Sequence, residues 1–346
     1  MSVHPSSPAP TRASSRLAWV DAAKGLSILL VVAHHTVEAL QTSGLAPAAL
    51  VTANTALAAM RMPLFFLASG LFVAGPLGAS WRTLLHKRVA LFLYLYAIWV
   101  LLRFAYFQIS AVAAADPGDA TDFVELVWSP LLPGSGMWFL YALALFAVIG
   151  KLLVGVPPWL QLAASGALSA FVGAEILQFE GEAWTRMARY LFFFLLGWHA
   201  RHLVEQLARS STLLRMVLAA AGCVACAAVA IGLDIRSVPG PALALNVLAL
   251  TFGILFAAWI SRYRVGRPLV VLGGRTLPVY LVHVFWLAAV MIGVQHLDLP
   301  RAAGFVLAPV LAVLLTVLSL LTQQALVRAG APWLFALPRR WAYRPR

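Results

Sequence analysis

The chain has 346 residues, of which 62% are hydrophobic and only 11% are charged, and its mean hydropathy is +0.89. Soluble domains carry roughly 25% charged residues, so this composition excludes an ordinary soluble protein. Its apolar runs are continuous over about twenty residues, as in membrane-spanning helices, rather than alternating over about ten, as in a β-barrel. The sequence therefore predicts an all-α, polytopic bundle embedded in the lipid bilayer.

The formal net charge of +13 could indicate a nucleic-acid partner, but the placement of the charges explains it without one. If the N-terminus is cytoplasmic, most Lys and Arg residues fall in cytoplasmic segments and most acids fall outside, as the positive-inside rule requires. We therefore expect both termini in the cytoplasm and no nucleic-acid partner. The C-x-x-C pair Cys223 and Cys226 lies in an apolar run and is predicted to pack there rather than to bind a metal.

We expect about ten spans, with the sixth short and the ninth kinked or broken because it contains Pro278. They cover residues 17–40, 50–74, 89–109, 137–154, 159–177, 187–202, 213–233, 241–260, 269–295 and 303–327. Residues 1–16, rich in Ser and Pro, are expected to form a disordered cytoplasmic tail. Residues 17–327 would form the membrane-embedded domain and residues 328–346 a basic cytoplasmic tail, while the outside loop 110–136 could cover a site.

The first span carries ionisable residues that a membrane helix normally avoids: Asp21, Lys24, His34, His35 and Glu38. Each such group costs several kcal/mol in the membrane, so it usually faces a protein interior or a wet cavity and marks function. Lys24 and His35 are eleven residues apart, which places them within roughly 20° on one helical face and roughly 16 Å apart along the axis. Asp21 and Glu38 fall near the same line, so this face is the first candidate site.

Two arginines lie inside apolar spans. Arg61 stands two residues before Pro63, which frees a backbone carbonyl, so Arg61 could support the local structure or a site. Arg103 lies deep in the third span, where an acidic partner would explain it. Ser69 and Gly70 in the second span are typical of close helix packing.

Three further groups have both an ordinary and a functional interpretation. His86, Lys87 and Arg88 form either a positive-inside anchor or a cluster of cations for a phosphorylated cytoplasmic ligand.

Trp138 and Tyr141, in the fourth span, belong either to an aromatic belt or to a site. Tyr280 and His283 are three residues apart and share one helical face. His283 lies in mid-membrane, where it is either a core histidine or part of the site.

Several of these segments resemble motifs of the acyltransferase-3 family of integral-membrane acyltransferases, and specifically its fucose 4-O-acetylase-like branch. The family's basic residue, ten others and His correspond to Lys24 and His35, within D-x-x-K-G. The further matches follow in the family's order over about three quarters of the chain: RMPLFFLASG, MWFLYAL, FLLGWHA and GRTLPVYLVH. The R-x-R that many members carry in the third helix is not matched by His86-Lys87-Arg88, and we expect no added esterase-like domain in this chain.

The resemblance implies a multi-pass enzyme of the bacterial inner membrane. It would move an acyl group, with acetyl expected, from cytoplasmic acetyl-CoA or another acyl-CoA to an envelope saccharide or lipid-linked saccharide. We expect His35 to act as general base, because an imidazole suits proton transfer near neutral pH. Glu38, one turn away, would orient and charge-stabilise it, whereas His34 points about 100° away and is the poorer candidate. A covalent acyl-histidine route stays open.

The remaining candidate residues are expected to bind the substrates, with no metal and no permanently bound cofactor. They are Asp21, Lys24, Arg61, Arg88, Arg103, Trp138, Tyr141, Tyr280 and His283. Lys24 and Arg61 would hold donor phosphates or stabilise the oxyanion. A secondary transporter or flippase that uses buried Lys, His and Glu as a relay is the alternative, since a broken ninth helix could line its path. A polar network that only holds the helices together is the non-functional interpretation.

Overall fold

The computed structural model describes residues 17–109, 122–134 and 136–338. The helices and helical turns follow in chain order: α1 (Ala18–Thr42), α2 (Ala48–Gly70), α3 (Ala74–Gly78), α4 (Trp81–Leu84), the π-helical turn η1 (Leu85–Val89), α5 (Ala90–Ile109), α6 (Phe123–Trp128), α7 (Trp138–Leu152), η3 (Leu153–Gly155), α8 (Pro158–Gly173), α9 (Glu182–His199), α10 (Arg201–Arg209), α11 (Leu213–Gly232), α12 (Pro241–Ile260), η4 (Arg264–Gly266), α13 (Arg267–Gly273), α14 (Thr276–Gln295), η5 (Arg301–Ala303), α15 (Gly304–Arg328) and η6 (Pro332–Leu334). No strand occurs in these described ranges, so the predicted all-helical fold is confirmed.

Eight helical segments within the described ranges are long and apolar enough to cross a bilayer, which makes the chain a polytopic membrane protein. The fifth and sixth predicted spans are present as α8 and α9, packed against each other. They differ from the other eight because α8 has only 16 residues and α9 carries Glu182, Arg186 and Arg189. The predicted number of about ten therefore counts two helices that are shorter or more charged than a typical span.

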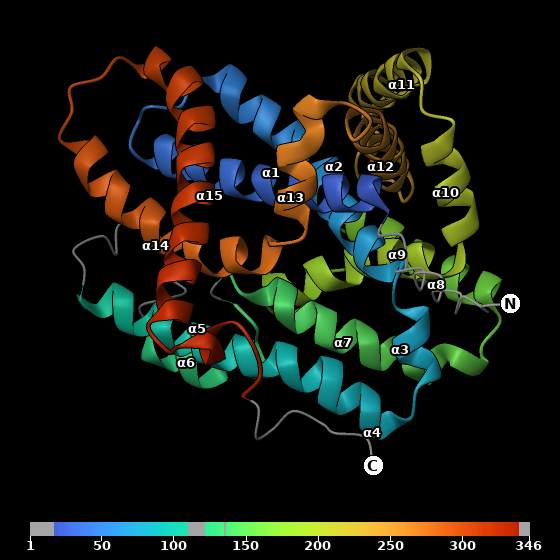
Figure 1. Cartoon of the computed structure of the whole chain (residues 1–346). Coiled ribbons are helices and arrows are strands. Elements are labelled where there is room, and N and C mark those ends of the chain that lie inside the picture. Colours follow the sequence, from blue (N-terminus) through green and yellow to red (C-terminus); the bar gives the residue numbers. More distant parts are fainter. Residues whose placement is uncertain (1–16, 110–121, 135, 339–346) are drawn as a thin grey trace, which may run out of the picture.

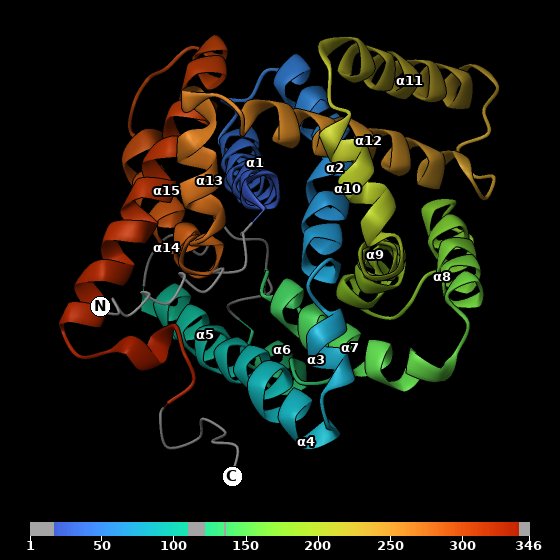
Figure 2. The same ribbon diagram turned by 45° about the vertical axis from the view of Figure 1, so that its right-hand side comes forward.

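Helix α1 is the centre of the bundle. It packs against α2, α12, α13, α14 and α15, and Figure 2 shows it nearly end-on between α13 and α2. Its apolar residues Ala22, Ala23, Ile28 and Val32 are completely buried. The ionisable residues of α1 are therefore surrounded by protein rather than by lipid, as the cost of charge in a membrane requires.

The predicted ninth span is broken, and the break lies at residues 274–275 rather than at Pro278. Helix α13 ends at Gly273 and α14 begins at Thr276, so Pro278 falls in the first turn of α14, where proline costs little. Gly273 is in backbone contact with α1, because a Cβ there would collide with the carbonyl oxygen of Asp21. In the same way, a Cβ on Gly25 of α1 would collide with the carbonyl oxygen of Leu269 in α13.

A second close crossing joins α2 and α9. A Cβ on Gly70 would collide with the carbonyl oxygen of Phe194, and one on Gly197 would collide with that of Leu67. The packing interpretation is thus confirmed for Gly70, since small residues let two backbones approach, whereas Ser69 lines the Lys24 cavity described below. The crossing fixes α9 relative to α2, which itself packs against α1.

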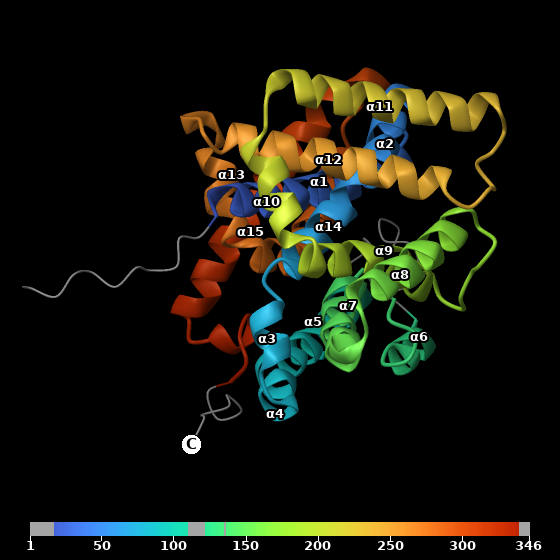
Figure 3. The same ribbon diagram turned by 90° about the vertical axis from the view of Figure 1, so that its right-hand side faces the viewer.

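Two helices, α11 and α12, form one edge of the bundle. Helices α11 and α12 lie side by side along one edge (Figure 3), and α11 exposes large apolar side chains such as Leu214 and Val224. Cys223 and Cys226 are free, partly buried cysteines on α11.

The segment after α15 returns to α5, where Trp99 Nε1 donates to the carbonyl of Leu334 at 2.7 Å. The predicted tail 1–16, residues 110–121 of the outside loop and residues 339–346 lie outside the described residues.

Candidate active site

Two cavities open along α1, one at each end of the polar face that the sequence predicts. The first, of about 530 Å³, contains Lys24 and is called here the Lys24 cavity. The second, of about 620 Å³, contains His35 and is called the His35 cavity. Lys24 and His35 are eleven positions apart on one helix, which corresponds to roughly 16 Å along the axis. A single helix face therefore joins the two cavities.

The Lys24 cavity is rich in cations. It is lined by Lys24 of α1, Arg88 of η1 and Arg201 of α10, with Asp21 on the same wall. Arginine and lysine suit phosphate groups, the arginine through its planar fork of donors. The π-helical turn widens the helix at residues 85–89, and it carries Arg88 to the cavity. Such turns often occur at functional sites.

Two of these cations lie close to the Phe72 ring. The Lys24 ammonium is 5.2 Å and the Arg201 guanidinium 5.6 Å from the ring centre. Glu205 accepts a hydrogen bond from Arg201 Nε at 2.8 Å and fixes the arginine there. The cavity thus combines positive charge with an aromatic face, a combination suited to a phosphorylated ligand that has a flat ring.

Arg201 was missed in the sequence analysis. It follows the sixth predicted span, where a basic residue is expected from topology alone. The pattern that could have found it is its place next to the family-like segment FLLGWHA.

The His35 cavity gathers polar residues from three helices. His34, His35 and Glu38 come from α1, Arg103 from α5, and Tyr280 and His283 from α14. Five of these six are residues that the sequence nominates for catalysis or binding. Glu182 and Arg186 of α9 also line this cavity, and the sequence places them only in an outside segment.

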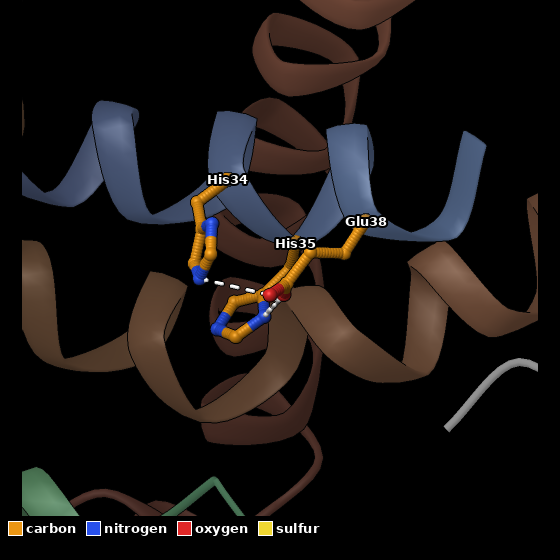
Figure 4. A group of neighbouring side chains, drawn as sticks. All are labelled: His34, His35 and Glu38. Carbon is orange, nitrogen blue, oxygen red and sulfur yellow. Dashed lines mark hydrogen bonds and ion pairs between the residues drawn. The ribbon is translucent and has the colours of Figure 1, made fainter. Parts of the chain in front are cut away.

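Both α1 histidines turn toward the Glu38 carboxylate (Figure 4). His35 Nδ1 lies 3.1 Å from Glu38 Oε2, and His34 Nε2 lies 3.2 Å from Glu38 Oε1. The helical angle of about 100° between the two histidines does not keep His34 away, because Glu38 follows them by four and three positions and both spacings are neighbours on a helix. His34 is therefore part of the same group as His35.

Roughly a third of the His35 side chain, 34%, stays accessible, and Glu38 is accessible over 53%. These exposed edges lie on the cavity, deep in the bundle. The group is thus open to a ligand in the cavity while the rest of α1 is packed.

His283 faces the His35 ring, with 5.4 Å between the ring centres. Its Nδ1 lies 2.8 Å from the carbonyl of Val279, four residues earlier. Because a carbonyl only accepts, Nδ1 carries the proton and Nε2 is an acceptor. In the described part of the chain, Nε2 has no hydrogen-bond partner, and a buried acceptor without a partner is costly.

Arg103 and Gly136 fit together at the cavity wall. Gly136 has φ +70°, and a Cβ there would collide with Arg103 Nη1, so the missing side chain makes room for the guanidinium. Tyr280 donates from its hydroxyl to the Gly136 carbonyl at 2.7 Å, which holds this loop in place. The guanidinium also lies 5.6 Å from the Phe107 ring centre.

Three nominated residues line neither cavity. Arg61 is buried and donates to Asn54 Oδ1 at 3.3 Å. Trp138 stacks on Tyr190, with ring centres 6.1 Å apart, and Tyr141 donates to the Pro130 carbonyl at 3.1 Å. Their contacts stabilise α2, the packing of α7 on α9, and the loop that precedes α7.

His34, His35 and Glu38 could also hold a metal ion, since their ligand atoms lie within 4.8 Å of one another. However, each carboxylate oxygen already pairs with an imidazole. Arg103, Arg61 and Arg186 add positive charge around His35, and this charge disfavours the binding of a metal cation there. The arrangement suits proton transfer better than cation binding.

A family model described as an acyltransferase domain matches residues 17–323, which include both cavities and every helix that lines them. The comparisons with curated proteins and with solved structures give no match.

Proposed function

Since the chain belongs to the acyltransferase-3 family of integral-membrane acyltransferases, we propose that it transfers an acyl group from acyl-CoA to a hydroxyl of a cell-envelope saccharide. Acetyl is the expected acyl group, and the bacterial inner membrane is the expected location. The observation that carries the proposal is the pair of cavities on one face of α1. One offers cations and an aromatic ring, and the other offers an imidazole paired with a carboxylate.

The Lys24 cavity is the proposed donor site. The positive-inside rule favours the cytoplasmic side for this cavity, which is where acyl-CoA is available. Lys24, Arg88 and Arg201 would bind the phosphates, and Phe72 offers a face for the adenine ring. The long flexible arm of CoA would then have to pass along α1 toward His35, past the completely buried Ile28, so the helices packed on this stretch would have to separate locally. Arg61, which lines neither cavity, is not assigned to the donor phosphates.

The His35 cavity is the proposed site of transfer. His35 Nε2 takes the proton of the acceptor hydroxyl as its oxygen attacks the thioester carbonyl carbon. The carbon–sulfur bond then breaks, and the departing CoA sulfur takes the proton back from Nε2. Glu38 holds the other ring nitrogen and balances the positive charge that forms on the imidazole between these steps.

Two other side chains complete the proposed site. Arg103 offers positive charge to the oxyanion of the tetrahedral intermediate; its guanidinium occupies the space left by Gly136 and lies over the Phe107 ring. His283 Nε2 accepts a hydrogen bond from a second hydroxyl of the acceptor, which would satisfy its buried lone pair. The acceptor would approach from the outer face of the membrane.

The test uses purified protein in nanodiscs with acetyl-CoA labelled in the acetyl group and an extract of envelope glycans. The proposal expects label in the glycan fraction and an equal amount of free CoA, both abolished in His35→Gln. Solute uptake into proteoliposomes without consumption of acetyl-CoA would instead establish the transporter alternative and overturn the proposal.

A further inference from the structure

We infer that Arg61 and Asn54 fix the tautomer of His34, and that the Nε2–H of His34 in turn holds Glu38 as the acceptor for His35 Nδ1, so that His35 Nε2 is the nitrogen without a proton. None of Arg61, Asn54 and His34 touches the reacting atoms, so they are positioning residues for the base that the proposed function assigns. The inference rests on the proposed function for its purpose, but the tautomers themselves follow from hydrogen bonds that can be measured without any substrate.

The hydrogen-bond chain begins at Arg61, which can only donate. Arg61 Nη1 lies 3.3 Å from Asn54 Oδ1, so the oxygen of the Asn54 amide faces the guanidinium. The amide nitrogen, Nδ2, therefore faces the other way and lies 3.0 Å from His34 Nδ1. An amide NH₂ only donates, so His34 Nδ1 must accept and carries no proton.

The hydrogen-bond chain then continues from His34 through Glu38 to His35. A neutral imidazole without a proton on Nδ1 carries it on Nε2, and His34 Nε2 lies 3.2 Å from Glu38 Oε1. The other oxygen, Oε2, lies 3.1 Å from His35 Nδ1. An ionised carboxylate only accepts, so His35 Nδ1 donates to it and His35 Nε2 keeps its lone pair.

The hydrogen-bond chain also determines which of the two histidines can take a second proton and become positively charged. His34 cannot take a second proton while Asn54 donates to its Nδ1, because that nitrogen has no free lone pair. His35 Nε2 is not engaged in the chain and can accept one. Proton uptake from the acceptor would therefore place the positive charge on His35, in contact with Glu38.

The chain has a simple origin in the sequence. Asn54 and Arg61 are seven residues apart on α2, about two helical turns, so they project on the same face. That face packs against α1 and meets His34 rather than His35. A single asparagine in an apolar span forms no pattern of its own, so Asn54 does not stand out in the sequence.

Histidine ¹⁵N NMR of the protein in nanodiscs, without substrate, tests the tautomers directly, because protonated and unprotonated ring nitrogens resonate far apart. Signals of His34 and His35 are assigned by their disappearance in His34→Gln and His35→Gln. We expect a proton on Nε2 of His34 and on Nδ1 of His35. A proton on Nδ1 of His34, or on Nε2 of His35, would overturn the inference.

Two substitutions of Asn54 by residues of similar size test the hydrogen-bond chain. Asn54→Leu removes the donor, so His34 should show a mixture of tautomers, and Asn54→Asp reverses the polarity, so His34 Nδ1 should become protonated. Thr55→Val is the matched control, because Thr55 is an exposed neighbour on α2. Unchanged His34 signals in both Asn54 variants would contradict the inference.

Activity separates this inference from the proposed function. We expect Asn54→Leu to lower kcat by about tenfold or more with the KM for acyl-CoA unchanged, because a base in the correct state contributes about 10²–10⁴-fold. The expected tautomers in a protein that transfers no acyl group would support the inference and refute the proposed function. Acyl transfer by a protein with the opposite tautomers would support the proposed function and refute the inference.

Discussion

Lys24 and His35 lie on one face of α1, and each lines a separate cavity. The helix between them is tightly packed, with Ile28 and Val32 completely buried. The positions of the two cavities are therefore fixed relative to each other by the rigid rise of one helix. A substrate that reaches both must be long and narrow, as acyl-CoA is, and the helices packed on α1 between the cavities must part to admit it.

Arg201→Ala should raise the KM for acyl-CoA by roughly tenfold and leave kcat nearly unchanged. Its guanidinium lines the Lys24 cavity, and removing a charge-assisted hydrogen bond to phosphate there should cost about 1.4 kcal/mol of binding free energy. Arg209→Ala is the matched control, because Arg209 also pairs with Glu205 but is 79% exposed and away from the cavity. Steady-state kinetics with both variants tests this, and an equal rise in KM would refute a local role for Arg201.

Gly136→Ala should both destabilise the protein and impair transfer. A left-handed backbone costs a residue with a Cβ about 1–2 kcal/mol, and this Cβ would also displace the Arg103 guanidinium. Gly44→Ala separates the two effects, because Gly44 has φ +75° with no atom near its Cβ position.

We expect similar decreases in thermal stability in both variants and a decrease in kcat in Gly136→Ala alone. The check is thermal unfolding in detergent together with a transfer assay. Full activity of Gly136→Ala would mean that the position of Arg103 does not matter.

Gly273→Ala should prevent α13 from docking on α1, since the added methyl group would meet the backbone of Asp21. The expected result is a poor yield of monodisperse protein and weak binding of CoA, because Asp21 and Lys24 border the same cavity.

Gly293→Ala, in α14 with open space around it, should instead be neutral or stabilising by about 0.5–1 kcal/mol. Size-exclusion profiles and CoA titrations compare the two. A Gly273→Ala protein that behaves like Gly293→Ala would show that the crossing can relax.

The sequence predicts the helices and the polar face of α1 well, because hydrophobic length and the helical repeat are local properties. It also nominates most of what the structure brings together in the His35 cavity, since charged residues inside spans stand out against an apolar background. The ninth span breaks as expected, although two adjacent glycines rather than Pro278 mark the break.

What the sequence does not reveal depends on how helices cross. Arg201 and Arg186 lie near span ends, where ordinary topology explains a basic residue, so only the fold shows that they line cavities. The helical angle of His34 makes it the poorer candidate, yet its side chain reaches Glu38 from the neighbouring position. Asn54 acquires its role only when α2 packs on α1.

The division of labour between the two cavities is tested most directly by measuring CoA binding and thiol release in one nanodisc preparation, for wild type, His35→Gln and Lys24→Gln. We predict that His35→Gln binds CoA like wild type but releases thiol from acetyl-CoA at least about 100-fold more slowly. Lys24→Gln should bind CoA more weakly. Normal thiol release by His35→Gln, or failure to bind CoA in His35→Gln but not in Lys24→Gln, would contradict the account.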